Sequence, residues 1–591
     1  MCEVSGESRR GSPNCRDVLG CSDSVDCSRI QPTGTSHGRT ADPGKIPGLG
    51  RSFFIKGCPS AMSERVASIP SHGTTDDSLY RHQTPSVLQI AFPSWCHRLL
   101  HYDRDIVSRL GPSLCDPTTS TYEMVLKALN SVEFADASKS AVLHRDLKSQ
   151  FLRTVGGEGN CYVVDGGRKL FDASGGAAVA CLGHSDKRVA EAIIRQLSNI
   201  AYSPSTFFTT PVCEQLAQFL INTTHGHMSR AYLVSSGSEA MEAAMKLSRQ
   251  YFLEKKPAEP QRHLYIARQR SYHGTTLGAL SMGGHVARRA NFKPMLLDNV
   301  VSHISPCFAY RDKLADESDE SYVAKLAKEL EDEFIRVGPG NVCAFVAEPV
   351  VGAALGCVPA VPGYFQAMKS VCDRYGALLI MDEVMSGMGR SGTLHAWEAE
   401  GVVPDIQTIG KGLAGGYQPI AGVLVNKRVV EVLEKGTSAF VHGHTYQGHP
   451  VACAAALEVQ QIIQSDGLVA NVQNMGQLLS GLLKESLMDH PYVGDIRGKG
   501  LFWGIEFVRD KQTKVPWPSA ARIAASINEL GLTEPYGIVV YPGSGTADGV
   551  LGDHIIVAPP YTVTRDEIAF VAETVTRLVN DFFSKLAIQG I

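Results

Sequence analysis

The 591-residue sequence contains no continuous apolar run of roughly 18 residues, the shortest length that reads as a transmembrane helix. It has little net charge, and the formal value of -4 gives no reason to expect nucleic acid or a membrane surface as a partner. A CxxC pair and a cysteine–histidine cluster with zinc spacing are both missing, so we predict no metal site. With 44% hydrophobic and 20% charged residues, the composition is that of an ordinary soluble globular enzyme.

The cysteines are unevenly distributed along the chain. Seven of the 15 fall in the first 120 residues, and the other eight are scattered singly, mostly in apolar settings such as those of Cys181 and Cys453. Isolated thiols in apolar surroundings are typical of reduced, buried cysteines in an intracellular protein. We therefore expect a cytoplasmic location. A mitochondrial one is the weaker alternative, because the N-terminal region is rich in Arg and Ser but also contains acidic residues.

Residues 1–130 differ in composition from the rest of the chain. They are rich in Ser, Gly, Pro, Arg and Asp and show no sustained hydrophobic periodicity. Such a segment buries too little apolar surface to offset the entropy of ordering it. We predict a disordered extension, or a start site placed too far upstream.

Strands and helices alternate through the middle of the chain. Apolar runs predict strands, and amphipathic stretches predict helices, of which the one at 186–197 has Ser185 as its expected N-cap. The alternation predicts an α/β fold with a mostly parallel sheet covered on both faces. The predicted strands are 231–234, 264–267, 342–347, 377–381 and 406–409, and the main predicted helices between or after them are 239–253, 322–335, 364–375 and 450–463.

After residue 467 the order of elements changes to a mixture of helices and strands, which indicates a smaller α+β domain. A predicted hairpin at 162–171 belongs with it, so both chain ends contribute to this domain. The predicted boundaries are 141–205 for the N-terminal part of the small domain, 206–466 for the large domain and 467–591 for the C-terminal part.

Two of the predicted strands each end on a charged residue. The strand at 377–381 leads directly into Asp382, and the strand at 406–409 leads through Gly410 to Lys411. Parallel strands present their carboxyl ends at one edge of a sheet, where open α/β sheets bind ligands. An aspartate and a lysine in one crevice suit pyridoxal phosphate (PLP), because lysine forms the Schiff base and aspartate pairs with the pyridinium nitrogen. The alternative is a solvated acid and an unrelated loop lysine.

Two further segments follow predicted strands. Gly237 and Ser238 stand at the start of a helix, where backbone N–H groups and the helix dipole favour a phosphate. A simple serine N-cap is the alternative there. Tyr272 follows the strand at 264–267 and is a candidate to stack on a cofactor ring, although most such tyrosines only pack.

Taken together, these motifs resemble those of the class III PLP-dependent aminotransferases of fold type I, and most closely the group that aminates pyruvate from ω-amino acids or amines. The resemblance extends over residues 141–586. The motifs that carry it are, in order, SSGSEAMEAAMK, SYHGTT, AEPVVG, MDEVMSGMGRSG, PDIQTIGKGLAGGYQPI, GHTYQGHPVACAAA and IRGKGLFWGIEF.

The resemblance implies a role for each matching residue. PLP would form an aldimine with Lys411, while Asp382 would bond its pyridine nitrogen. The other implied residues are Gly237 and Ser238 at the phosphate, Tyr272 and Val384 on the two ring faces, Glu348 supporting the site, Thr445 reaching the phosphate in the partner subunit, and Arg497 binding the substrate carboxylate. The role of Thr445 implies a homodimer at least. For Arg497 the alternative is a salt bridge within the domain.

One position departs from the pattern of several ω-aminotransferases. These enzymes have a glutamate, after the Glu-Pro motif, that pairs with the substrate arginine, and here Ala353 takes its place. The substrate class therefore cannot be copied from those enzymes, and donor and acceptor stay open. From the resemblance as a whole we predict ping-pong transfer of an amino group from an amino acid or ω-amine to a 2-oxo acid such as pyruvate or 2-oxoglutarate. The alternatives are another PLP enzyme of the same fold (racemase, mutase or decarboxylating transaminase) and a non-enzymatic cofactor-binding or interaction protein.

Overall fold

The computed structural model describes residues 140–588, and the predicted extension at 1–130 lies outside them. Within this range no helix is both long and apolar enough to cross a membrane. The predicted α/β architecture is confirmed: helices and strands alternate around one large sheet, and a smaller set of sheets and helices stands beside it.

The large sheet has seven strands in the order β4-β12-β11-β10-β7-β5-β6. All its neighbours are parallel except β12, which runs antiparallel to both β11 and β4. β6 and β12 were not predicted from the sequence. The strands are β4 (Met228–Val234), β5 (Leu264–Arg268), β6 (Val301–Ile304), β7 (Val342–Ala347), β10 (Leu378–Asp382), β11 (Ile406–Ile409) and β12 (Ala421–Asn426).

Helices cover both faces of this sheet, because its central strands are apolar on both sides. In β10, Leu378 and Ile380 pack into the core that α7 (Gly237–Glu254) also enters. Leu379 and Met381 point the other way, into the core formed with α11 (Asp319–Val337) and α12 (Tyr364–Arg374). Such near-continuous apolar strands are typical of sheets buried on both faces.

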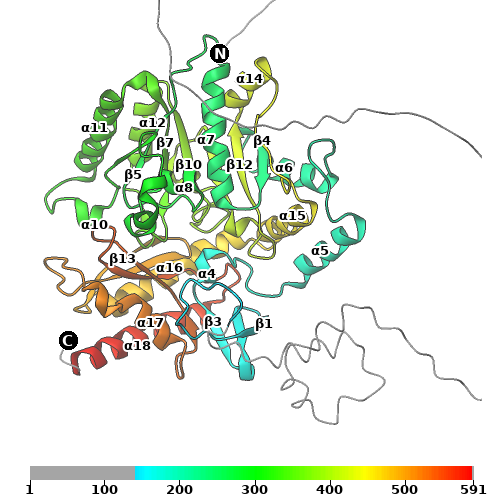
Figure 1. Cartoon of the computed structure of the whole chain (residues 1–591). Coiled ribbons are helices and arrows are strands. Elements are labelled where there is room, and N and C mark those ends of the chain that lie inside the picture. Colours follow the sequence, from blue (N-terminus) through cyan, green and yellow to red (C-terminus); the bar gives the residue numbers. More distant parts are fainter. Residues whose placement is uncertain (1–139, 589–591) are drawn as a thin grey trace, which may run out of the picture. The chain divides into compact units, whose positions relative to one another are not determined.

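The smaller part of the fold joins the two ends of the described chain (Figure 1). One four-stranded sheet has the order β1-β2-β3-β15, so strands from the N-terminal side pair with one from the C-terminal side. A second has the order β13-β14-β17-β16. The strands are β1 (Thr154–Glu158), β2 (Cys161–Val164), β3 (Lys169–Asp172), β13 (Val493–Lys499), β14 (Phe502–Phe507), β15 (Ile538–Val539), β16 (Tyr541–Ser544) and β17 (Asp553–Val557).

A single extended core binds this part together, with α16 (Leu468–Leu487), α17 (Ile523–Gly531) and α18 (Arg565–Ile588) packed on the sheets. The predicted boundaries at 205 and 467 stay a prediction. The remaining helices and strands are α4 (Gly175–Ala178), α5 (Lys187–Asn199), α6 (Pro211–Asn222), α8 (Leu277–Met282), α9 (Val286–Arg289), α10 (Ala309–Asp312), α13 (Ala396–Glu400), α14 (Lys427–Lys435), α15 (Pro450–Ser465), β8 (Val350–Val351) and β9 (Val358–Pro359).

One predicted helix cap is wrong. The N-cap of α5 is Asp186, whose Oδ1 accepts the backbone N–H of Arg188 at 2.9 Å, and Ser185 lies one residue outside with a φ of 69°. Both residue types cap helices well, and the pattern of apolar positions does not distinguish neighbouring candidates.

Candidate active site

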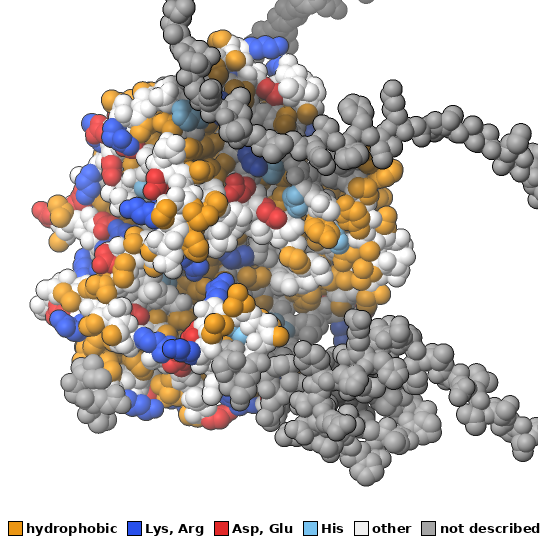
Figure 2. Space-filling model, in the orientation of Figure 1, with side chains coloured by type: hydrophobic (Ala, Val, Ile, Leu, Met, Phe, Trp, Pro, Cys, Tyr) orange, Lys and Arg blue, Asp and Glu red, His pale blue; other side chains and the backbone are white. Residues whose placement is uncertain are grey.

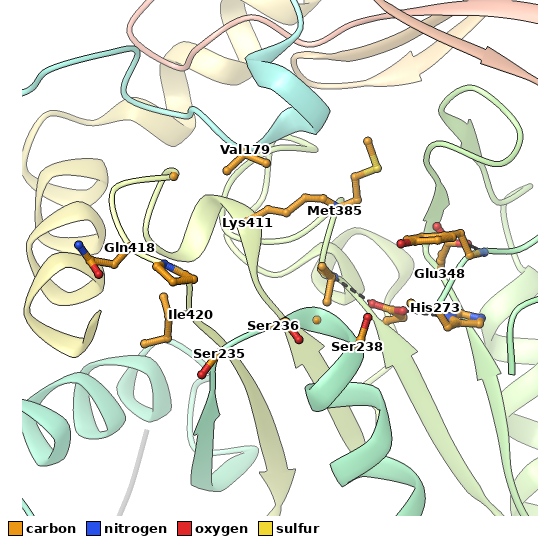
Figure 3. Close-up of a pocket in the computed structure, with 17 residues that line it drawn as sticks. Val179, Ser235, Ser236, Ser238, His273, Glu348, Met385, Lys411, Gln418 and Ile420 are labelled. Carbon is orange, nitrogen blue, oxygen red and sulfur yellow. Dashed lines mark hydrogen bonds and ion pairs between the residues drawn. The ribbon is translucent and has the colours of Figure 1, made fainter. Parts of the chain in front are cut away.

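The carboxyl ends of the sheet strands surround one cavity of about 430 Å³. β10 delivers Asp382, β11 delivers Lys411, and β4 leads through Ser235 and Ser236 into α7. Figure 3 shows Lys411 reaching across the middle of this cavity, with Ser236 and Ser238 on one side. The sequence-predicted residues that line it are Gly237, Ser238, Tyr272, Glu348, Asp382, Val384 and Lys411.

Asp382 is buried and accepts hydrogen bonds at both carboxylate oxygens. Thr408 Oγ1 donates to Oδ1 at 2.9 Å, and the backbone N–H of Val384 donates to the same oxygen at 3.1 Å. His273 Nδ1 lies 2.7 Å from Oδ2. These partners come from three separate segments, so the carboxylate is fixed in one orientation toward the cavity. Sequence reasoning missed His273, although it directly follows Tyr272.

Lys411 is held in an unusual backbone conformation. Its φ is 46°, in the left-handed region that non-glycine residues seldom adopt and that stores on the order of 1 kcal/mol of strain. The turn after it is held by Gln460 of α15, which donates to the carbonyls of Gly412 and Leu413 at 3.0 and 2.9 Å. Burial lowers the pKa of the Lys411 amine, against the raising influence of Asp382 and Glu348. The amine is therefore easier to deprotonate than an exposed lysine.

The start of α7 forms an anion cradle at the cavity. Ser236 is the N-cap, and its Oγ accepts the N–H of Glu239. Gly237 and Ser238, the first two helical residues, have backbone N–H groups without an intrahelical acceptor. A Cβ on Gly237 would lie 2.9 Å from Val384 Cγ1, so only glycine leaves the backbone open here. Helix N-termini of this kind bind phosphate.

Glu348 lines the cavity and is hydrogen-bonded to the backbone of Tyr272. Its carboxylate accepts the backbone N–H of Tyr272 at 3.0 Å and that of Gly352 at 3.1 Å. Burial raises the pKa of Glu348. The residue thus fixes the loop that presents the Tyr272 ring, and it leaves a second carboxyl group close to Asp382.

Thr445 lies outside this cavity. It lines a separate, polar cavity of about 540 Å³ with Tyr202, His442 and His444. Its predicted contact with the phosphate of a partner subunit stays a prediction.

Arg497 is also absent from the cavity lining, although it is almost fully buried at 7% exposure. Its Nη1 lies 2.7 Å from Glu506 Oε2 and 3.0 Å from Asp495 Oδ2, and its Nε donates to the carbonyl of Gly356 at 2.9 Å. Its Nη2 donates to the carbonyl of Leu355. The guanidinium is thus engaged within the chain, and its predicted role at a substrate carboxylate stays a prediction.

Comparison with known proteins points to one family. The model of the family "Aminotransferase class-III" matches residues 144–579, about three-quarters of the chain. An aminotransferase of Gibberella zeae is 52% identical over 437 residues, which cover 74% of this chain and 85% of the relative.

Solved structures agree with the sequence relatives. An (S)-enantioselective ω-transaminase from Thermomicrobium roseum is 34% identical with a TM-score of 0.70, over 79% of this chain and 99% of that one. The ω-transaminase of Pseudomonas jessenii in complex with pyridoxamine phosphate is 30% identical with a TM-score of 0.71, over 76% of this chain and 98% of that one.

Proposed function

Since the chain belongs to the class-III aminotransferase family and is therefore a transaminase, we propose that it transfers an amino group from an amino acid or ω-amine to a 2-oxo acid, such as pyruvate or 2-oxoglutarate, in a ping-pong reaction. The observation that carries this proposal is the convergence of Asp382, Lys411 and the α7 N-terminus on one cavity. The three groups differ in charge and chemistry, and a single phosphorylated pyridine ligand uses them all.

Family membership implies PLP as the cofactor, and the residues present fit it. The cavity volume of about 430 Å³ is in the range of small-molecule sites. The N–H groups of Gly237 and Ser238 would hold the phosphate, and the Asp382 carboxylate would face the pyridine nitrogen. When bound, PLP would supply an electron sink: its ring takes up the electron pair that remains when the carbon bearing the donor's amine loses its proton.

The chain's own residues then have distinct tasks. Lys411 Nζ would be the nucleophile that attaches the cofactor, and its free amine would take up the proton that the donor carbon loses, which its lowered pKa favours. Asp382 would stabilise a proton on the pyridine nitrogen by its negative charge, and His273 and Thr408 keep that carboxylate oriented. Tyr272 and Val384, which line the cavity, would enclose the ring and exclude water.

Replacing Lys411 tests the proposal. Lys411→Ala should lower turnover by at least about 1000-fold and remove the visible absorbance that PLP acquires on attachment to a lysine. Lys435→Ala, at the exposed end of α14, is the matched control and should behave like the unsubstituted enzyme. Full turnover by Lys411→Ala would show that another group is the nucleophile.

Rapid mixing with an amino donor separates transamination, with or without decarboxylation, from the racemase and mutase reactions. The unsubstituted enzyme should accumulate the aminated cofactor, pyridoxamine phosphate, before a 2-oxo acid is added. Proton exchange at the donor without this accumulation would indicate a racemase or mutase instead.

We also propose a homodimer. Large hydrophobic side chains are exposed around Thr445 and the segment before α6, including Phe207 at 78%, Val441 at 76% and Tyr446 at 57%. Figure 2 shows hydrophobic side chains gathered on the side where Figure 1 places α6 and α15. A clustered apolar surface of this kind is typical of a subunit interface, and a second copy there would bring Thr445 near the partner's cavity.

The proposed location is the cytoplasm. All eight cysteines of the described residues are free thiols, and most are buried. Reduced thiols in this number suit a reducing compartment.

A further inference from the structure

A transaminase that uses 2-oxo acids needs a cation for the substrate carboxylate. Arg497 meets this need only after giving up existing partners, because its donors serve Asp495, Glu506 and two backbone carbonyls. Freeing a buried guanidinium from such a network is unfavourable, since the groups left behind lose their hydrogen bonds away from water. A second arginine near the cavity has no such commitments.

That second arginine is Arg288, in the short helix α9 (Val286–Arg289). Its guanidinium carbon lies 4.9 Å from the centre of the Tyr272 ring, and Tyr272 lines the cavity. The side chain is half-buried and, like that of Arg497, is not itself among the residues that line the cavity, which it approaches through the Tyr272 ring. Among residues 140–588 no carboxylate pairs with it and no backbone carbonyl accepts from it.

Arg289, the next residue in α9, has a structural role and serves as a comparison. Arg289 bonds to Asp298 at 2.7 Å and to the carbonyls of Ser281 and Gly283. Its donors therefore fasten α9 to the rest of the fold. Arg288 directly precedes Arg289 in the chain, yet it makes none of these bonds.

The positive charge of Arg288 favours lower pKa values for two residues that line the cavity, Lys411 and Tyr272. Burial lowers the pKa of Lys411 and the Arg288 guanidinium adds to that lowering. Burial raises the pKa of the Tyr272 phenol, and Arg288 opposes the rise. Arg145 also acts on Tyr272, but its side chain is exposed and water screens it.

Building on the proposed transaminase function, we infer that Arg288 binds the substrate carboxylate over the Tyr272 ring, and that Arg497 has a structural role. A planar guanidinium suits this task because it forms two parallel bonds to a carboxylate while stacking on an aromatic ring. The site therefore favours amino acids and 2-oxo acids over amines that lack a carboxylate. Asp382 and Glu348, the two carboxyl groups of the cavity lining, disfavour a second anion there, so a cation at the edge of the cavity would favour the binding of such substrates.

The inference is tested by comparing substrates with and without a carboxylate in Arg288→Gln. We expect KM for pyruvate and for alanine to rise about 10- to 100-fold, the range for losing one charge-assisted pair. The rate of cofactor amination by 1-phenylethylamine, which has no carboxylate, should change less than about 3-fold. Arg288→Lys should recover part of the loss, because an ammonium keeps the charge but not the fork.

Arg336→Gln is the matched control. Arg336 lies at the exposed end of α11 and pairs with Glu333, so the variant removes the same charge far from the cavity. Its KM values should equal those of the unsubstituted enzyme. A second measurement needs no turnover: calorimetric binding of propionate to the purified enzyme should weaken in Arg288→Gln and persist in Arg336→Gln.

Several results would overturn the inference. An equal loss with 1-phenylethylamine and with alanine would mean that Arg288 only supports Tyr272. Unchanged KM for pyruvate together with unchanged propionate binding would mean that another group holds the carboxylate. Failure of the unsubstituted enzyme to aminate its cofactor with either donor would instead refute the proposed function, so the two failures are distinguishable.

Discussion

At the scale of single residues, the site depends on how Asp382 is held. Its carboxylate is buried at 5% exposure, and a buried charge without partners is strongly unfavourable. His273, Thr408 and the Val384 amide together satisfy both oxygens. The result is a carboxylate that cannot rotate away from the cavity.

Thr408→Val tests this arrangement with little change of shape. The variant removes the 2.9 Å bond from Oγ1 to Asp382 Oδ1, and kcat should fall about 10-fold, equivalent to about 1.4 kcal/mol. KM should change little, because Thr408 does not line the cavity.

A buried threonine elsewhere serves as the control for Thr408. Thr224 at the end of α6 donates to the carbonyl of Ile221 at 2.7 Å. Thr224→Val should lower the free energy of unfolding by about 1 kcal/mol and leave kcat unchanged. Equal kcat for Thr408→Val and the unsubstituted enzyme would mean that the threonine bond does not orient Asp382.

Some residues of the candidate site could be predicted from the sequence and others could not. Asp382 and Lys411 follow apolar strands directly, so their position at the sheet edge was predictable. His273 follows Tyr272 in the same segment, and the reasoning that selected the tyrosine gave no signal for its neighbour. Arg288 belongs to a four-residue helix without periodicity, and only folding brings it to Tyr272.

At the scale of elements, the start of α7 joins sheet and cavity. Gly237 lies against Val384, which follows β10, so the helix N-terminus and the aspartate strand approach each other closely. This contact sets the distance between the N-terminus of α7 and Asp382. A side chain at Gly237 must push the two apart.

Gly237→Ala should therefore weaken PLP binding. The added Cβ would lie 2.9 Å from Val384 Cγ1 and 3.1 Å from Cγ2, closer than normal packing allows. We expect the dissociation constant of PLP, measured by fluorescence titration, to rise about 10-fold or more.

Gly481→Ala provides the opposite case. This glycine is inside α16, and a Cβ there meets nothing within 4 Å. The variant should raise the free energy of unfolding by up to about 1 kcal/mol through helix propensity and leave PLP affinity unchanged. If both variants bound PLP normally, the Gly237–Val384 contact would not limit the cradle.

Two strands of the large sheet, β12 and β6, were not predicted from the sequence. β12 carries the apolar run AGVLVN and is antiparallel to both neighbours, so it breaks the strand–helix alternation on which the prediction rested. β6 is only four residues long and is half-exposed at Ser302 and His303. Neither its length nor its pattern separates it from a loop.

At the scale of the whole molecule, folding removes His554 from water. This residue of β17 is fully buried, and its ring lies against Gly356 and Gly543. Burial lowers the pKa of His554 to about 3, and Arg497 adds to the lowering. The folded protein therefore keeps this histidine neutral under conditions in which an unfolded chain protonates it.

This burial makes stability depend on pH. Between an unfolded pKa of about 6.5 and the folded value of about 3, the unfolded state binds one more proton at this residue, so the free energy of unfolding falls as pH falls. The slope from one such histidine is on the order of 1 kcal/mol per pH unit. His554→Gln should lack this contribution.

Chemical denaturation at pH 7, 6 and 5 measures the difference. The unsubstituted protein should lose more stability over this range than His554→Gln, whatever the absolute stability of the variant. His225→Gln, at a side chain that is 76% exposed, should keep the slope of the unsubstituted protein. Parallel slopes for His554→Gln and the unsubstituted protein would contradict the assignment.

The sequence by itself determined the fold class and the centre of the site. Hydrophobic periodicity is local, so strands, helices and the charged residues that end them are visible in short windows of sequence. Tyr272, Asp382, Lys411 and the Gly237–Ser238 turn all follow from that local logic.

Only the tertiary structure decided which partners each cation has. Arg497 stands in a motif that predicts a substrate contact, yet β14 places Glu506 against it and the loop before β9 adds two carbonyls. Arg288 stands in no motif, yet α9 brings it over the Tyr272 ring. Partners at long sequence separation fix the role of a charged side chain, because electrostatic and hydrogen-bond energies depend on distance in space and not on position in the chain.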